Sequence, residues 1–248
     1  ISACLVGSEM CIRDSSNANV TRSEGTQDMP SASGEADSAS TTSSSESGSG
    51  SSDVGVAAAV SVNIVKVHNT ATVTNGAGIS ADGSANILAE AEVDAIAKAT
   101  GYAVSLESES DNIAAAVGFN YVHAENTAIV GEGSSLRGFD VNVKALTPDD
   151  ATNDFVVWGA SGAGGQGDVA VAGSAAINIV KFRTEASTPR SAGIVAEDDI
   201  TVQAENDLRV QTLAVGAAFS LGDDAAVGAA IAVAVVDGIN ADGDDDTD

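Results

Sequence analysis

The segment VSVNIV (60–65) is the strongest indication of the fold, because near-copies of it recur along the chain. They read VGFNYV (117–122), AAINIV (175–180) and IAVAVV (231–236), offset by 57, 58 and 56 residues. An asparagine holds the same place in the first three copies, at Asn63, Asn120 and Asn178, and Ala234 holds it in the fourth. A period of this size is typical of solenoids, propellers and arrays. The sequence therefore predicts three full units of about 57 residues and the start of a fourth.

Each unit is predicted to consist of strands. Between residues 54 and 64 the larger apolar side chains fall on even positions, and Gly, Ala, Ser and Asn occupy the odd ones. Alternation with a period of two and many β-branched residues indicates a strand. Neither face is charged before Lys66, so we expect both faces to be covered, or one to pack closely against another backbone layer. Helix is the competing prediction, because alanine is a strong helix former.

Other landmarks keep a similar spacing. The glycines are Gly101, Gly159 and Gly216, and the later strands are ILAEAE (87–92), VNVKAL (141–146) and ITVQAE (200–205). Turn-forming clusters separate the apolar strands at SESD (108–111), GAGGQGD (162–168) and GDD (222–224). We therefore expect units that start near residues 54, 112, 168 and 224.

The fold class expected from residues 54–236 is all-β, a repetitive β-solenoid, or parallel β-helix. A unit rich in strands cannot bury its own faces, so neighbouring units must stack to form a continuous core. Two coils of about 28 residues per unit would give about seven coils and a length of roughly 34 Å. Long antiparallel hairpins remain an alternative. Neither end carries an evident cap, which predicts a piece of a longer array.

The N-terminal part differs in composition from the repeats. LVGSEMCIRDS (5–15) resembles a translated sequencing adapter, so residues 1–15 are expected to be an artefact. Both cysteines, Cys4 and Cys11, lie there, which leaves the repeats without disulfides or thiolate metal sites. Residues 16–53 are rich in Ser, Gly and acids and are expected to be disordered, with residues 31–53 as an enlarged loop at the edge of the solenoid.

Charge and composition exclude several classes of partner. The 10 basic and 36 acidic side chains give a formal net charge of −26, which disfavours nucleic acid and anionic membranes. No apolar run reaches the roughly 18 residues of a membrane-spanning helix, so no membrane insertion of this segment is expected. Aromatic residues make up only 3% of the chain, a composition that suits a narrow interior of small side chains.

The pattern VGVAAAVSVNIV…NTATV…GISADGSANILAEAE (54–92) resembles the repeats of very large bacterial surface adhesins. It is similar to the filamentous-haemagglutinin-like and leukotoxin-like β-helical families, over residues 54 to about 236. The resemblance implies an exported segment at the bacterial cell surface, associated with the outer membrane. It also implies adhesion to a host or matrix ligand, contact with neighbouring repeats of the same chain, and no catalysis.

Few residues offer catalytic chemistry. His68 and His123 do not occupy equivalent places in their units, and a zinc site on them would need carboxylate partners. A β-helical carbohydrate-active enzyme is a second alternative and would need converging carboxylates with basic residues nearby. The candidate acids are the pairs 149–150, 198–199 and 223–224, and the nearest bases are Lys144, Lys181 and Arg183. Paired acids in loops are usually solvated, so the chain is not expected to be an enzyme.

No cofactor is expected from the sequence, and calcium is the one alternative. The acidic tail at 237–248 carries carboxylates at every second position from residue 242 onward, and the candidate ligands are Asp242, Asp244, Asp246 and Asp248. Oxygen ligands at this spacing suit Ca²⁺. The tail departs from an EF-hand, because the glycine is misplaced and no closing glutamate is present. The alternatives are thus a calcium-binding β-solenoid module and a truncated, unliganded tail.

Overall fold

The computed structural model describes residues 38–47, 54–105, 111–166, 169–222 and 225–238. The first coil contains β2 (Val54–Val73), β3 (Gly78–Ser80), β4 (Ala85–Glu90) and β5 (Asp94–Ser105). The second contains β6 (Asp111–Val130), β7 (Ser135–Gly138), β8 (Val141–Leu146) and β9 (Asn153–Gly165). The third contains β10 (Ala170–Ser187), β11 (Gly193–Ala196), β12 (Ile200–Glu205) and β13 (Leu208–Ser220). Strand β1 (Ser38–Ser47) precedes these coils, and β14 (Ala226–Gly238) follows them.

Equivalent strands of successive coils form four sheets. Sheet A has the order β1-β5-β9-β13 and sheet B the order β14-β10-β6-β2, while the two short sheets are C (β11-β7-β3) and D (β12-β8-β4). Every pairing within them is parallel. The predicted all-β solenoid is therefore confirmed, and the antiparallel-hairpin and helical alternatives are wrong. Within the described ranges, no helix is long and apolar enough to cross a membrane.

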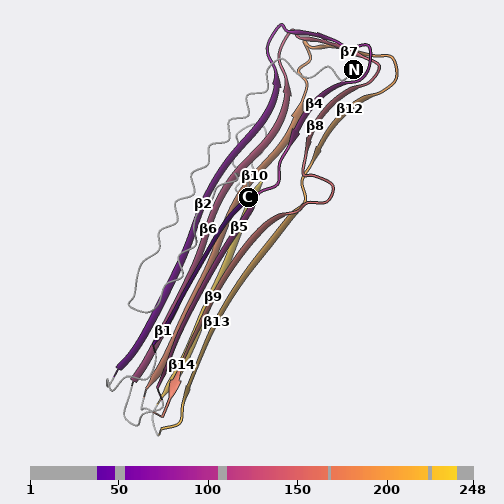
Figure 1. Cartoon of the computed structure of the whole chain (residues 1–248). Helices are drawn as coiled ribbons and strands as arrows, with labels where there is room; N and C mark the ends of the chain where they lie inside the picture. Colours follow the sequence, from indigo (N-terminus) through magenta and orange to yellow (C-terminus); the bar gives the residue numbers. More distant parts are fainter. Residues whose placement is uncertain (1–37, 48–53, 106–110, 167–168, 223–224, 239–248) are drawn as a thin grey trace.

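Each unit makes one coil. Val60 pairs with Val117, Val117 with Ala175, and Ala175 with Ile231, so the repeat alignment of these strands is confirmed. The prediction of two coils per unit is wrong. The strands are longer than it assumed, because β2 and β6 each have 20 residues and span roughly 66 Å, so a single coil takes up the whole unit. Figure 1 shows the result, an elongated body in which long strands run side by side.

The interior between sheets A and B is thin because small side chains face it. Alanines such as Ala97, Ala99 and Ala116 are fully buried there. A Cβ added to Gly101 would lie 2.4 Å from the Ala115 carbonyl oxygen, and one added to Gly159 would lie 2.6 Å from that of Ala175. Real Cβ atoms do not approach backbone this closely, so the two sheets meet where only glycine fits. The small-residue face of each long sheet B strand therefore packs against another backbone layer, as the sequence predicted.

Buried asparagines connect the two long sheets. The Asn120 side chain donates from Nδ2 to the carbonyl oxygens of Ala95 (2.8 Å) and Val156 (3.1 Å). Asn178 donates in the same way to the Phe155 carbonyl oxygen at 2.8 Å. Both asparagine side chains are completely buried. The recurring asparagine of the sequence repeat thus links sheet B to the backbone of sheet A.

The sandwich widens toward one end, where the corner sheets C and D lie (Figure 1). The buried side chains become larger along this direction. Phe155 and Phe182 pack with ring centroids 6.3 Å apart, and Leu136, Val141 and Val143 fill the corner. Gly76 and Gly133 adopt positive φ at equivalent turns into β3 and β7, a conformation that favours glycine. The gradient from Ala and Gly to Val, Leu and Phe sets the distance between the layers.

The register corrects three details of the sequence alignment. Ile87 pairs with Val143, so the segment 87–92 is displaced by two residues from its predicted match with 141–146. Ala95 follows Glu90 by five positions, whereas their partners Leu146 and Phe155 are nine positions apart. This longer connection shifts β9, so Ser161 stacks between Gly101 and Gly216. The shift is even, so Gly159 still faces inward.

The third detail is the glycine-rich segment 162–165, which belongs to β9 and is not a turn. Aromatic rings from neighbouring strands lie over two of its glycines. A Cβ added to Gly162 would lie 2.9 Å from the nearest atom of the Tyr102 ring. A Cβ added to Gly164 would lie 2.3 Å from the nearest atom of the Phe219 ring. Rings that cover glycines in adjacent strands are a known way to stabilise a sheet. The glycines therefore make room for the outward-facing aromatic residues of sheet A.

The Ser-rich segment also differs from the expectation of disorder. Residues Ser38–Ser47 form β1, which pairs with β5 in the register Ser38↔Asp94. The edge of β5 offers backbone donors and acceptors, and pairing with them satisfies the backbone of β1 whatever its side chains. Residues 38–47 are thus one more copy of the sheet A strand. Residues 1–37 and 48–53 lie outside the described part of the chain.

Candidate functional site

The outward side of sheet B carries large apolar side chains in rows. We call this surface, made by the outward residues from 54 to 64 of β2 and their partners in β6, β10 and β14, the apolar face. Its rows follow the register, for example Val56, Ile113, Val171 and Val227. Val56 is 58% exposed and Ile231 is 65% exposed. The sequence left open whether both faces were covered; in the structure, the face with the larger residues is the outer one.

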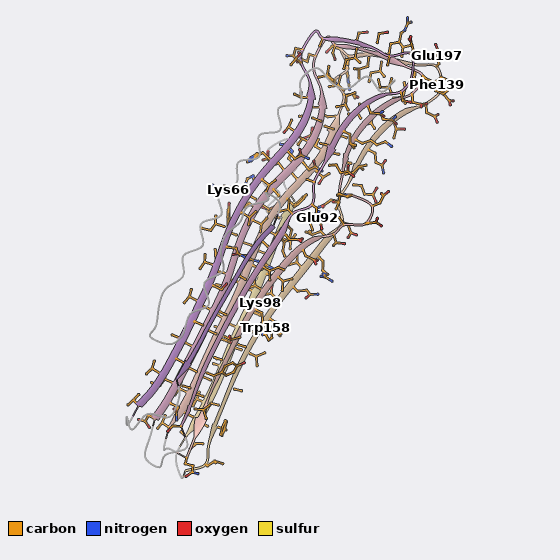
Figure 2. All side chains as sticks on the ribbon, in the orientation of Figure 1. Lys66, Glu92, Lys98, Phe139, Trp158 and Glu197 are labelled. Carbon is orange, nitrogen blue, oxygen red and sulfur yellow. The ribbon has the colours of Figure 1, made fainter. Side chains whose placement is uncertain are left out.

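A band of charged residues borders the apolar face. In β2 the outward positions change from Ile64 to Lys66 and His68, and in β10 they change from Ile179 to Lys181 and Arg183. Lys181 forms an ion pair with Asp237 of β14, with Nζ 3.4 Å from Oδ2, and Arg183 forms one with Glu185. Lys66 projects from one side of the sandwich, and Lys98 and Trp158 project from the other (Figure 2). The charged band therefore continues the outward positions of the same strands that carry the apolar face.

Two histidines and a glutamate meet within this band. We call His68, His123 and Glu125 the histidine cluster. The Nε2 atom of His123 lies 3.2 Å from Glu125 Oε1, and that of His68 lies 3.5 Å from Glu125 Oε2. The imidazole rings are stacked, with centroids 5.8 Å apart and planes at 25°. All three side chains are at least partly exposed, so the cluster is open to solvent.

The sequence missed this cluster because the two histidines are 55 residues apart, not 57. The Asn-Thr pairs at 69–70 and 126–127 fix the register, which places His68 opposite Glu125 and Lys66 opposite His123. His123 lies two residues before Glu125, so it points to the same face of the sheet. Diagonal neighbours on adjacent strands lie within reach of long side chains. Register and strand parity together were the signal that could have found the cluster.

A second group of acids lies at the corner, near Phe139 and Glu197 in Figure 2. Asp140, Asp198 and Asp199 bring carboxylate oxygens within 4.8 Å of one another. Asp140 accepts hydrogen bonds from the Ser84 hydroxyl at 2.7 Å and from the Asp199 backbone N–H at 3.4 Å. These bonds tie the equivalent turns of successive coils together. Asp140 thus has a structural role in the corner.

The other candidate residues fall in different places. The proposed calcium ligands Asp242, Asp244, Asp246 and Asp248 lie outside the described residues, as does the acid pair 223–224. The acids at 149–150 occupy an exposed turn between β8 and β9, whereas those at 198–199 lie in the corner turn before β12. The bases Lys181 and Arg183 form their ion pairs on sheet B. The candidate acids at 149–150 and 198–199 and the bases Lys181 and Arg183 therefore lie on different elements of the fold.

No family model matches the chain, and neither curated proteins nor solved structures gave a match.

Proposed function

We propose that the chain is a non-catalytic structural and adhesive stalk segment of a bacterial cell-surface or secreted adhesin. The mechanical part rests on the parallel stacking of whole repeat units. Each coil adds a full row of backbone hydrogen bonds to every sheet, so an array of such coils grows along one axis. A stalk built in this way holds a binding region away from the cell.

The apolar face is the observation that carries the adhesive part. It repeats the same outward rows in every coil, so one weak contact is multiplied along the stalk. Each basic side chain of β10 in the bordering band is paired with an acid, which keeps that part of the band close to neutral. The chain as a whole is strongly acidic, so contact between the rest of its surface and an anionic surface is disfavoured. The proposed ligand is therefore an apolar surface of a host or matrix.

Adsorption of the full chain to defined surfaces tests this proposal. A quartz-crystal microbalance coated with a methyl-terminated monolayer should retain the protein, and a hydroxyl-terminated monolayer should not. The combined change Val56→Thr, Val171→Thr and Val227→Thr should weaken retention at least about tenfold, because covering a valine contributes on the order of 1 kcal/mol. Threonine keeps the β-branched shape that suits a strand.

The matched control carries the same chemical change on other surfaces, as Val104→Thr, Val195→Thr and Val215→Thr. These valines are exposed too, on strands of sheets A and C. The control should adsorb like the unchanged chain. Equal loss in both variants, or no retention on the methyl surface, would contradict the adhesive role. Release of reducing sugar from a polysaccharide panel would contradict the non-catalytic role.

A further inference from the structure

The histidine cluster has the ligand set of a metal site. It offers two imidazole nitrogens and one carboxylate, and its ligand atoms all lie within 4.8 Å of one another. Imidazole with carboxylate suits zinc and other late first-row divalent metals, whereas Ca²⁺ and Mg²⁺ prefer oxygen ligands alone. Three protein ligands plus water is a common arrangement for zinc outside purely structural sites. The residue types therefore select the class of metal.

The distances fit the same conclusion. A tetrahedral site with metal–ligand bonds of about 2.05 Å has ligand–ligand edges of about 3.3 Å. The Nε2 atom of His123 lies 3.2 Å from Glu125 Oε1 and that of His68 lies 3.5 Å from Glu125 Oε2, so each nitrogen stands about one such edge from one of the two carboxylate oxygens. The side chain of His68 is 52% exposed, which leaves room for water in the fourth position.

The charges around the cluster permit a cation. On β2, Lys66 lies in register with His123, and on β10 Lys181 and Arg183 lie in register with His123 and Glu125. Lys181 and Arg183 have their own acidic partners, Asp237 and Glu185. The net charge of −26 also attracts cations to the molecule as a whole. The charge of Lys66 therefore opposes the binding of a cation, whereas the net negative charge of the chain favours it.

From these observations we infer that His68, His123 and Glu125 form a binding site for a divalent metal of the zinc class. The metal is held by Nε2 of each histidine and by the Glu125 carboxylate, and water completes its coordination. His68 belongs to β2, whereas His123 and Glu125 belong to β6, so the bound metal connects two successive coils. A metal that binds the folded chain and not the unfolded chain would stabilise this pair of coils.

Nuclear magnetic resonance of the imidazole ring protons tests the site directly, because the chain has only two histidines. The full chain is alkylated at its cysteines and held in excess Ca²⁺, which occupies sites made of oxygen ligands alone. At a pH of about 7.5, where free imidazole is mostly neutral, one equivalent of Zn²⁺ should shift the signals of both histidines together. Signals that do not move at one equivalent would overturn the inference.

Three variants sharpen this test. In His123→Gln the His68 signal should no longer respond to one equivalent of Zn²⁺. Glu125→Gln should weaken binding by more than about tenfold, since even groups that only orient a ligand change affinity by 10–100-fold. Asp154→Asn is the matched control, because it also removes one carboxylate, from a pair with Arg209 on sheet A. An unchanged His68 response in His123→Gln, or equal weakening in Asp154→Asn, would show that no such site exists.

Discussion

Replacement of Gly159 by valine is expected to prevent the second coil from closing. The new Cβ would lie 2.6 Å from the Ala175 carbonyl oxygen and 3.5 Å from that of Ala116. Both atoms belong to the backbone of sheet B, which cannot move without breaking its pairing. Steric conflicts of this kind are among the few causes of losses above about 4 kcal/mol. Urea unfolding followed by circular dichroism should show this loss, or no folded baseline at all.

Gly173→Val is the matched control for that substitution. Gly173 also lies inside a long strand, but nothing lies within 4 Å of an added Cβ. Valine is favoured in strands, so the change in unfolding free energy should stay within about 0.5 kcal/mol or be stabilising. If Gly159→Val unfolds at the same urea concentration as Gly173→Val, the two sheets do not approach as closely as described.

Asn120→Asp should produce the second large effect. The change keeps the shape of the side chain but replaces the Nδ2 donor by an oxygen, facing the carbonyl oxygens of Ala95 and Val156. Burial of a carboxylate without a positive partner raises its pKa above the unfolded value of about 3.9. The folded state then binds more protons than the unfolded state above that pH. Stability should therefore fall as the pH rises from about 4, by up to about 1.4 kcal/mol per unit.

Asn142→Asp supplies the control for this pH dependence. Asn142 donates to Asn86 Oδ1 at 2.8 Å in an exposed contact between β8 and β4. A carboxylate there stays in water, so the variant should unfold with the pH profile of the unchanged chain. Thermal melting of both variants between about pH 4 and pH 8 separates the two cases. Parallel profiles for Asn120→Asp and Asn142→Asp would mean that residue 120 is not buried.

The repeat could be read from the sequence where side-chain identity is constrained. Asn63, Asn120 and Asn178 stack in the predicted register, because each lies in the interior and few residues fit there. The alignment failed where the interior tolerates alternatives, as at Ile87, whose neighbours are also apolar. The number of coils per unit was not predictable in this way. It depends on where the long strands end and turn. Alternation with a period of two is the same for one coil per unit and for two.

The candidate site shows a similar limit. The sequence contains every residue of the histidine cluster, but only the register between β2 and β6 brings them together. The acidic tail drew attention because its carboxylates lie close together in sequence. Ligands that come from adjacent strands are separated by a whole unit, so local spacing does not reveal them.

Disulfide formation between equivalent positions shows whether one repeat unit makes one coil. Val60 and Val117 are outward-facing partners in adjacent strands, about 4.8 Å apart across the sheet. The pair Val60→Cys and Val117→Cys should therefore oxidise spontaneously to a bond that peptide mass mapping assigns to residues 60 and 117. Val60→Cys with Ala175→Cys is the control, because two strand spacings, roughly 9.6 Å, exceed the reach of a disulfide. If the first pair stays reduced or the second pair forms the bond, equivalent strands are not neighbours and the one-coil repeat is wrong.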